Sequence, residues 1–275
     1  MPEGDILRRT AATLDAALTG AVLTTCELRW PSVASVDLTG RTVLGTHSYG
    51  KHLFTRFDDG RTVHSHLRME GSWRLEDAVP NGGARGTAAG GRLSYARNPY
   101  VRAVLGTERW TAVGERLGML DVVPTREEHT LIGHLGPDIL APEFTTVGLP
   151  EALRRYDARG SAPVAEVLLD QTVLAGIGTI YMAESLFARS LWPWTPADRV
   201  DDPASLLMTA CVLLQRSVDA QQRVDAGSNP WVVRAVHGRR GRPCRRCSTP
   251  VAEGQAGRAP MERPVFYCPH CQPPR

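Results

Sequence analysis

The sequence is almost without lysine. Of its 32 basic residues, 31 are arginine, and Lys51 is the only lysine. A guanidinium stays protonated at any ordinary pH, whereas a lysine amine can lose its proton and act as a base or a nucleophile. Arginine can replace lysine wherever only charge matters, so Lys51 is a candidate for chemistry. The alternative is that one lysine survives by chance.

Long apolar runs are also missing. No stretch approaches the roughly 20 residues that a membrane-spanning helix needs, and the opening MPEGDILRRT lacks the apolar segment of a signal peptide. We therefore expect a cytoplasmic protein with no membrane partner. The 275 residues are 42% hydrophobic and 22% charged, which is ordinary for a globular chain of two small domains, or of one domain with an appendage.

Cysteine is scarce, but its spacing is informative. Four of the six cysteines form two C-x2-C pairs, Cys244 with Cys247 and Cys268 with Cys271, with residues 248–267 between the pairs. This is the spacing of a zinc ribbon, in which each pair offers two thiolates to one tetrahedral ion. Disulfides are rare in the cytosol. We expect one structural Zn²⁺ with no open coordination position.

The net charge of +3 is too small to indicate nucleic acid by itself, but basic residues are clustered near the first cysteine pair. The cluster consists of Arg234, Arg239, Arg240, Arg242, Arg245 and Arg246. Such a cluster is typical of a phosphate-binding surface. A solvated basic loop is the alternative.

The hydrophobic pattern predicts an α+β fold. Apolar residues at helical spacing predict a helix over 4–19, which Gly20 ends. Short alternating segments then predict strands at 21–28, 41–44, 51–57, 62–69, 73–75 and 93–105, with a glycine-rich loop at 80–91. Helices are expected at 150–156, 163–171, 179–190 and 204–220, followed by a polar connector over 221–233. The first half is therefore expected to be a β-sandwich with one long helix.

The N-terminus carries a second amine that could do chemistry. Met1 precedes Pro2, a small residue after which the initiator methionine is normally removed. The secondary amine of Pro2 could attack C1′ of a deoxyribose and form an iminium. Glu3, beside it, could transfer protons. Taken alone, Pro2 and Glu3 favour the interpretation of an ordinary helix start.

Combined, the motifs are far more specific. In chain order they are MPEGD, YGKHLFTRF, HSHLRMEGSWR, HLGPDIL, LLDQTVLAGIGTIYMAE and CRRC…ERPVFYCPHCQ, spread over essentially the whole chain. The chain resembles the formamidopyrimidine-DNA glycosylase/endonuclease VIII family, and is more similar to its bacterial endonuclease VIII branch. The resemblance implies a catalytic β-sandwich domain at 1–130, a helix–two-turns–helix DNA-binding domain at 131–233 and a zinc finger at 234–275.

The resemblance also implies an activity. A member of this family is a bifunctional DNA glycosylase and abasic-site lyase of base excision repair, which here would act on oxidised pyrimidines in damaged DNA. Pro2 would be the Schiff-base nucleophile, Glu3 the proton donor and shuttle, and Lys51 the lysine that assists β-elimination. Arg263 would hold phosphates at the lesion and assist δ-elimination. We expect a monomer that joins the nucleoid when it binds DNA.

Further residues are expected to contact DNA. Met69 matches the loop that fills the gap left by a flipped nucleotide, although a core methionine at a strand end is the alternative. Gly178 and Thr179 begin a predicted helix whose N–H groups could bind a phosphate, and Arg239 and Arg240 belong to the basic cluster. Thr179 stands where the family normally has asparagine.

Two histidines on one predicted strand, His64 and His66, could suggest a second metal site. No third ligand is spaced to join them, so histidines paired with neighbouring residues are the expected interpretation.

Two rival functions remain open. The chain could be an abasic-site lyase that has lost base excision, or a non-catalytic DNA-binding module that kept the scaffold. The presence of Pro2, Glu3, Lys51 and Arg263 together favours an enzyme.

Overall fold

The computed structural model describes residues 2–78, 95, 97–222 and 234–274. Met1, the loop predicted at 80–91, the start of the strand predicted at 93–105 and most of the connector predicted at 221–233 lie outside these residues. By their contacts the described residues form two compact units. The first contains Pro2 and Ile6–Gly133, and the second contains Glu3–Asp5 and His134 onward.

Helix α1 (Gly4–Leu18) confirms the first predicted helix. Leu7, Leu14 and Leu18 are almost fully buried, because their spacing places them along one side of the helix. Gly20 follows with φ +81°, a left-handed conformation that glycine adopts without steric cost at a helix end. The helix thus begins and ends where the sequence predicts.

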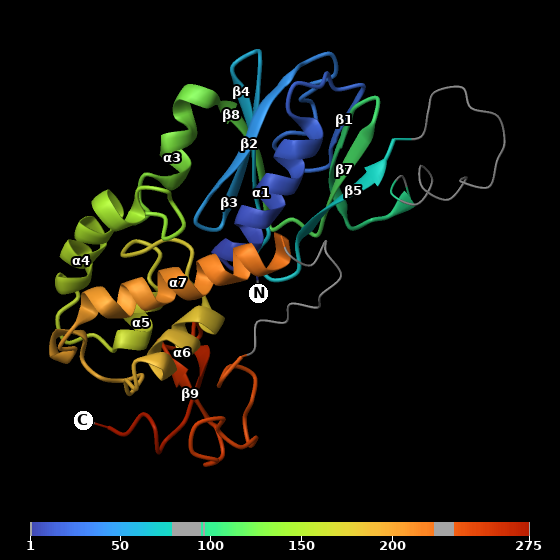
Figure 1. Ribbon diagram of the computed structural model, residues 1–275. Helices are drawn as coiled ribbons and strands as arrows, with labels where there is room; N and C mark the ends of the chain where they lie inside the picture. The colour runs from blue at the N-terminus through green and yellow to red at the C-terminus, as the bar shows by residue number, and fades with distance from the viewer. Residues whose placement is uncertain (1, 79–94, 96, 223–233, 275) are drawn as a thin grey trace. The chain divides into compact units, whose positions relative to one another are not determined.

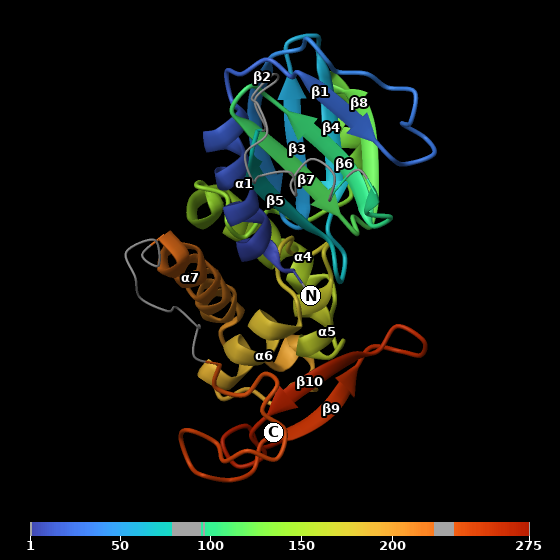
Figure 2. The ribbon, with the colours of Figure 1, turned by 90° about the vertical axis from the view of Figure 1, so that its right-hand side faces the viewer.

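The first unit is a β-sandwich of two antiparallel four-stranded sheets (Figure 2). One sheet has the order β1 (Thr25–Leu28), β6 (Val101–Gly106), β7 (Trp110–Glu115), β5 (Ser72–Asp77). The other has the order β2 (Val43–Tyr49), β3 (His52–Phe57), β4 (Arg61–His66), β8 (Met119–Pro124). Apolar residues of both sheets and of α1 share one core. The expected β-sandwich with its long helix is therefore confirmed.

Several strand boundaries differ from the prediction. Strand β1 is shorter than 21–28, β2 continues to Tyr49 instead of ending at 44, and β4 ends at His66 before Met69. Sequence analysis missed β7 and β8 completely. β8 pairs with the distant strand β4, and β7 pairs with the distant strand β5 as well as with its sequence neighbour β6; this pairing stabilises them more than any local pattern does.

The predicted lysine lies in the turn of the first of two consecutive hairpins. Tyr49 pairs with His52, so Gly50 and Lys51 form a two-residue turn between β2 and β3. Gly50 has φ +55°, which the first position of such a turn requires. Gly60, with φ +79°, lies in the next turn, between β3 and β4.

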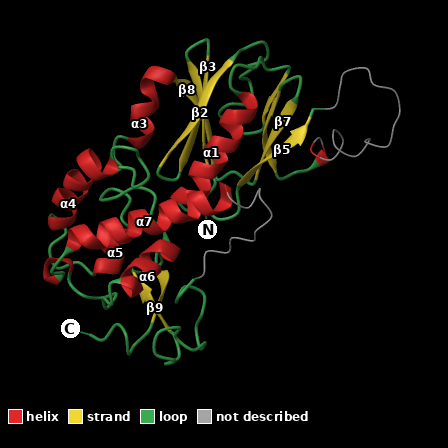
Figure 3. Ribbon diagram, in the orientation of Figure 1, coloured by secondary structure: helices red, strands yellow, loops and turns green. Residues whose placement is uncertain are grey.

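The second unit is helical apart from one hairpin (Figures 1 and 3). Its longer helices are α4 (Leu149–Asp157), α5 (Val164–Leu169), α6 (Thr179–Ala188) and α7 (Pro203–Gln222). Shorter helical segments are η2 (Phe144–Gly148) and η3 (Ala197–Arg199), while η1 (Thr125–Glu127) and α3 (Glu128–Ile132) end the first unit. Each predicted helix of this unit is present, with ends shifted by a few residues.

The C-terminal segment packs on these helices. Strands β9 (Ala252–Ala256) and β10 (Arg263–Tyr267) form an antiparallel hairpin between the two cysteine pairs. Val251, Val265 and Cys268 belong to the same hydrophobic core as α6 and α7. The segment therefore lacks a core of its own and is stabilised by the helices. Across the described residues, no helix has both the length and the apolar character that crossing a membrane requires.

A matched pair of leucines tests the sandwich core. Leu120 on β8 is fully buried, whereas Leu44 on β2 of the same sheet is 58% exposed. We expect Leu120→Ala to lower the free energy of unfolding by about 2–5 kcal/mol, because it leaves a cavity in a packed core. We expect Leu44→Ala to change it by less than about 0.5 kcal/mol. Urea denaturation measures both; equal effects would contradict the assignment of the core.

Candidate active site and metal centre

Glu3 is held at the start of helix α6. The residue is 1% exposed, and its carboxylate accepts hydrogen bonds from the N–H of Gly178 at 2.8 Å and of Ile180 at 2.7 Å. The N–H of Tyr181 donates a longer bond of 3.4 Å. Unpaired N–H groups and the helix dipole favour a negative charge at a helix start. The first turn of α6 therefore fixes the Glu3 carboxylate and favours its ionised form.

Asp5 adds a second attachment for the beginning of the chain. Its Oδ2 accepts hydrogen bonds from the hydroxyls of Tyr181 at 2.8 Å and Ser217 at 2.6 Å. Burial, followed by the charge of Asp5, raises the pKa of Tyr181, so its hydroxyl remains a donor. The N–H of Gly4 donates to the carbonyl of Gly176 at 2.8 Å. The residues next to Pro2 are thus bonded to α6, to α7 and to the turn before α6.

That turn is fixed by Gln171. The side-chain amide donates to the carbonyls of Leu169 and Ile177, both at 2.9 Å, and its oxygen accepts the N–H of Gly176 at 3.1 Å. Gly176 has φ +110°, a conformation that other residues rarely adopt. The LDQ…AGIG motif therefore forms a well-defined turn that presents the start of α6.

The geometry refines the predicted phosphate contact. The N–H of Gly178 already donates to Glu3. Within the described part of the chain, the N–H of Thr179 has no hydrogen-bond partner. Of the two predicted residues, Thr179 is thus the one whose N–H remains for a phosphate. The contact with DNA stays a prediction.

Pro2 and Lys51 are both half-buried and belong to the first unit. Lys51 lies at the tip of the β2–β3 hairpin, and Pro2 immediately precedes the fixed carboxylate of Glu3. Pro2 therefore lies shortly before α1, and Lys51 lies in the turn between β2 and β3. Their catalytic roles stay predictions.

Met69 is an exposed loop residue. It is 64% exposed and lies beyond the end of β4, so it is not a core residue. Beside it, Glu70 pairs with Arg116 at 2.6 Å, and the Arg116 guanidinium lies 4.0 Å from the centre of the Tyr100 ring. Sequence analysis did not single out Arg116, because nothing in chain order places it near Met69. The wedge role of Met69 stays a prediction.

The four predicted zinc ligands come together. The thiol sulfurs of Cys244, Cys247, Cys268 and Cys271 all lie within 4.8 Å of one another. Cys244 and Cys271 are 4.0 Å apart at sulfur, and Cys247 and Cys268 are 3.5 Å apart. In a tetrahedral site with Zn–S bonds of about 2.3 Å, sulfurs lie about 3.8 Å apart. The cluster therefore fits one metal ion.

The electrostatics of the four thiols also favour a cation. Hydrogen bonds from Thr249 lower the pKa of Cys247 to about 6. Burial raises the pKa of Cys268, and raises that of Cys271 to about 12. Thiols so close together cannot all ionise unless a cation compensates their charges, and a bound dication would draw off the remaining protons.

Some arginines of the basic cluster make structural contacts, and others are exposed at the surface. The Arg246 guanidinium packs 4.3 Å from the Phe187 ring and donates to Ser190, so it fastens the cysteine segment to the end of α6. Arg240 is exposed and pairs loosely with Glu253 at 3.6 Å, and Arg239 donates to the carbonyl of Pro243. Arg263 is exposed at the start of β10. The roles of Arg239, Arg240 and Arg263 on DNA stay predictions.

Glu184 is a key residue that sequence analysis missed. This buried carboxylate on α6 accepts the N–H groups of Ala235, Val236 and His237 at 2.8–3.0 Å. Burial lowers the pKa of His237 to about 4, so its ring is neutral at neutral pH. The sequence does carry a signal for Glu184, because it is an acidic residue inside a mostly apolar helical segment. A buried carboxylate in such a segment requires hydrogen-bond partners.

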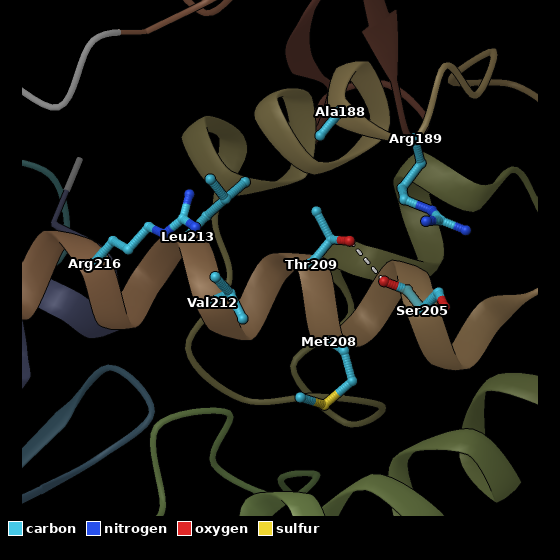
Figure 4. Close-up of a pocket in the computed structure, with 8 residues that line it drawn as sticks. All are labelled: Ala188, Arg189, Ser205, Met208, Thr209, Val212, Leu213 and Arg216. Carbon is cyan, nitrogen blue, oxygen red and sulfur yellow. Dashed lines mark hydrogen bonds between the residues drawn. The ribbon is translucent and has the colours of Figure 1, made fainter.

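A cavity of about 370 Å³ opens between α6 and α7 (Figure 4). Its lining contains Arg189, Met208, Thr209, Val212 and Arg216. The hydroxyl of Thr209 donates to the carbonyl of Ser205 in its own helix. None of the residues predicted for catalysis lines this cavity.

Comparison with known families matches two parts of the chain. Residues 1–102 match the Formamidopyrimidine-DNA glycosylase N-terminal domain, and residues 135–226 match the Formamidopyrimidine-DNA glycosylase H2TH domain. The H2TH match covers the described helices α4–α7.

Curated relatives match almost the whole chain. A "Probable endonuclease 8 2" of Streptomyces coelicolor is 42% identical over 99% of this chain and 94% of the relative. An "Endonuclease 8 2" of Mycobacterium tuberculosis is 37% identical over 99% of this chain and all of the relative. The "DNA-(apurinic or apyrimidinic site) lyase Nei2" of Mycolicibacterium smegmatis is 36% identical over 99% of both chains.

Solved structures share the fold. The MutM (Fpg) protein of Thermus thermophilus is 27% identical with a TM-score of 0.74, covering 98% of each chain. The Lactococcus lactis Fpg in a complex with an abasic site containing DNA is 21% identical with a TM-score of 0.78, covering 99% of this chain and 100% of that one. The chain therefore belongs to the formamidopyrimidine-DNA glycosylase/endonuclease VIII family of DNA glycosylases and abasic-site lyases.

Proposed function

We propose that this protein is a bifunctional DNA glycosylase and abasic-site lyase that excises oxidised bases, chiefly pyrimidines, and cleaves the resulting site by β,δ-elimination. The observation that carries the proposal is the buried Glu3 carboxylate, which the start of α6 fixes next to Pro2. A carboxylate fixed beside a secondary amine can take the proton that the amine loses on attack.

The first step joins the protein to the sugar. The Pro2 nitrogen forms a bond to C1′ while the bond from C1′ to the base breaks, and the base leaves with the electron pair of that bond and takes a proton from water. Glu3 takes the proton released by the Pro2 nitrogen and delivers it to the ring oxygen O4′ as the sugar opens, which leaves an iminium. The ionised form of Glu3, which α6 favours, is the form that can accept this proton.

The second stage cleaves the backbone. Lys51 takes a proton from C2′ of the iminium, and the 3′ phosphate leaves. Water then takes a proton from C4′ and the 5′ phosphate leaves, while Arg263 stabilises the charge of the departing phosphates. Arg239, Arg240 and the N–H of Thr179 would hold neighbouring phosphates, and Met69 would occupy the space of the flipped nucleotide.

An abasic-site lyase without base excision is the second candidate. The Mycolicibacterium smegmatis relative is named as an abasic-site lyase, and Thr179 departs from the family's asparagine. Such an enzyme would keep Pro2 and Lys51 in the same roles but would not release an oxidised base.

We further propose that the ion held by the four cysteines is Zn²⁺. Four thiolates with no water or substrate position are the donor set of a structural zinc site. The ion would stabilise the hairpin that carries Arg263 and would take no part in the reaction.

Borohydride trapping tests the nucleophile. After loss of Met1 the chain has two amines, the N-terminus and Lys51. We expect adducts with a duplex that carries an oxidised pyrimidine and with one that carries an abasic site. Mass spectrometry should locate both adducts on Pro2, and Pro2→Gly should lower their yield at least about tenfold.

Each other outcome of the trapping experiment is informative. An adduct with the abasic duplex alone would favour the lyase candidate. An adduct on Lys51 would contradict the role of Pro2. The absence of an adduct with either duplex would contradict the enzymatic proposal and would favour a non-catalytic DNA-binding module.

Gly178→Ala tests the position of Glu3. A Cβ at Gly178 would lie 2.5 Å from Glu3 Cδ and 2.6 Å from its Oε1, so the carboxylate must move. We expect the single-turnover rate of base release to fall at least about tenfold, because a misplaced catalytic group is costly. Gly45→Ala is the matched control, since its nearest neighbour is an Asp15 oxygen at 3.5 Å. Equal rates in the two variants would show that this position of Glu3 does not matter.

Elemental analysis tests the metal centre. We expect one zinc per chain in the wild type, none in Cys268→Ser, and a full complement in the control Cys211→Ser, whose thiol lies outside the cluster. Loss of zinc should lower the melting temperature and weaken DNA binding, since structural zinc sites supply apparent binding energies on the order of 10 kcal/mol. A wild-type protein that contains no zinc, and whose melting temperature is nevertheless not lowered, would refute the proposal.

A further inference from the structure

Aromatic and acidic side chains cross one face of the β2-β3-β4-β8 sheet. Three cross-strand pairs continue one another: His47 with Phe54, Phe54 with His64, and His64 with Asp121. His52 lies two residues before Phe54 and therefore points to the same face. The opposite face carries residues of the sandwich core, such as Leu53, Val63 and Leu120.

Three of these side chains form a chain of hydrogen bonds. His52 Nδ1 and His64 Nε2 are 2.8 Å apart, and His64 Nδ1 lies 3.2 Å from Asp121 Oδ2. An ionised carboxylate only accepts, so His64 donates through Nδ1 and accepts through Nε2 from the Nδ1–H of His52. The hydrogen bonds thus run in one direction along what we call the Asp121–His64–His52 relay.

The middle of the relay is tightly enclosed. His64 is 0% exposed, and its ring centre lies 5.0 Å from that of Phe54 and 5.1 Å from that of His52, at interplanar angles of 28° and 14°. Burial lowers the pKa of His64, so the ring is neutral at neutral pH and can both donate and accept. Nitrogens 2.8 Å apart leave no room for a metal ion between these two rings, and His64, one of the two histidines expected to pair with neighbouring residues, pairs with His52 and Asp121.

The relay reaches the hairpin tip through His52. This residue directly follows Lys51 and forms the last strand pair before the Gly50-Lys51 turn. His66 packs edge-on against His52 at 5.0 Å. Burial and, next, the positive charge of Lys51 lower the pKa of His66 to about 4, so the charge of Lys51 acts on this cluster.

We propose that the Asp121–His64–His52 relay is a positioning device for Lys51, in which the fixed His52 ring holds the base of the hairpin tip so that the Lys51 amine reaches C2′ in the elimination step. This inference rests on the proposed role of Lys51. Two positioning residues, Asp121 and His64, act through His52 and need no contact with the substrate.

Two variants interrupt the relay at different points. His64→Phe keeps a ring in the stack but removes both hydrogen bonds, and Asp121→Ala removes the acceptor from a side chain that is 36% exposed. For each we expect the single-turnover rate of β-elimination on a preformed abasic duplex to fall about tenfold. The Kd for a duplex with an uncleavable tetrahydrofuran abasic analogue should stay within about twofold.

Phe54→Leu is the matched control. It disturbs the same stack and should lower the melting temperature, but it leaves both hydrogen bonds in place, so its elimination rate should stay within about threefold of wild type. A rate loss in Phe54→Leu equal to that in His64→Phe would show that packing matters rather than the relay, and would overturn the proposal.

A double-mutant cycle with Lys51→Ala identifies the target of the relay. If the relay acts through Lys51, adding His64→Phe to Lys51→Ala should not lower the residual rate further. Multiplicative losses, or wild-type rates in both relay variants, would overturn the inference while Lys51 itself stays confirmed. If Lys51→Ala alone cleaves as well as the wild type, the proposed role of Lys51 fails instead, and the inference falls with it.

Discussion

The hydrogen bonds between the Glu3 carboxylate and the first turn of α6 are the constraint on which the candidate active site depends. A buried carboxylate is costly unless donors compensate its charge, and here three backbone N–H groups and a helix dipole do so. The turn that presents those N–H groups is in turn fixed by Gln171 and by the conformation of Gly176. Any change that moves the start of α6 therefore also moves the residue next to Pro2.

A second buried carboxylate, on α6 itself, is also compensated by backbone N–H groups. Glu184 accepts three consecutive N–H groups of residues 235–237, just before the first cysteine pair. One helix thus uses its N–H groups to bind the carboxylate of Glu3, and a carboxylate of its own to bind the chain that leads to the metal centre. Arg246 strengthens the second attachment through Phe187 and Ser190. Helix α6 is therefore the common support of the N-terminal carboxylate and the metal-binding segment.

Features that depend on residues close together in the sequence could be predicted, and features that depend on residues far apart in the sequence could not. The α1 helix and the cysteine spacing are local patterns, and the sequence predicts both of them. Strands β7 and β8, the partners of Glu184 and the Asp121–His64–His52 relay depend on residues that are distant in the chain. His64 and His66 drew attention because they are two apart in sequence, yet the hydrogen-bond partners of His64 are His52 and Asp121 on the neighbouring strands. Cross-strand register, which the sequence does not display, decides such contacts.

The near absence of lysine now has a physical interpretation. Phosphate binding does not require lysine, because arginine side chains and backbone N–H groups can bind phosphates as well. The Schiff base and the proton abstraction that we propose need amines that can lose a proton, and the sequence offers two, Lys51 and, once Met1 is removed, Pro2. In the chain each amine directly precedes a fixed group: Pro2 precedes Glu3, whose carboxylate is hydrogen-bonded, and Lys51 precedes His52, whose ring ends the hydrogen-bonded relay. An amine on a flexible chain would spend most of its time away from C1′ or C2′, so fixing its neighbour reduces the entropy that each attack must overcome.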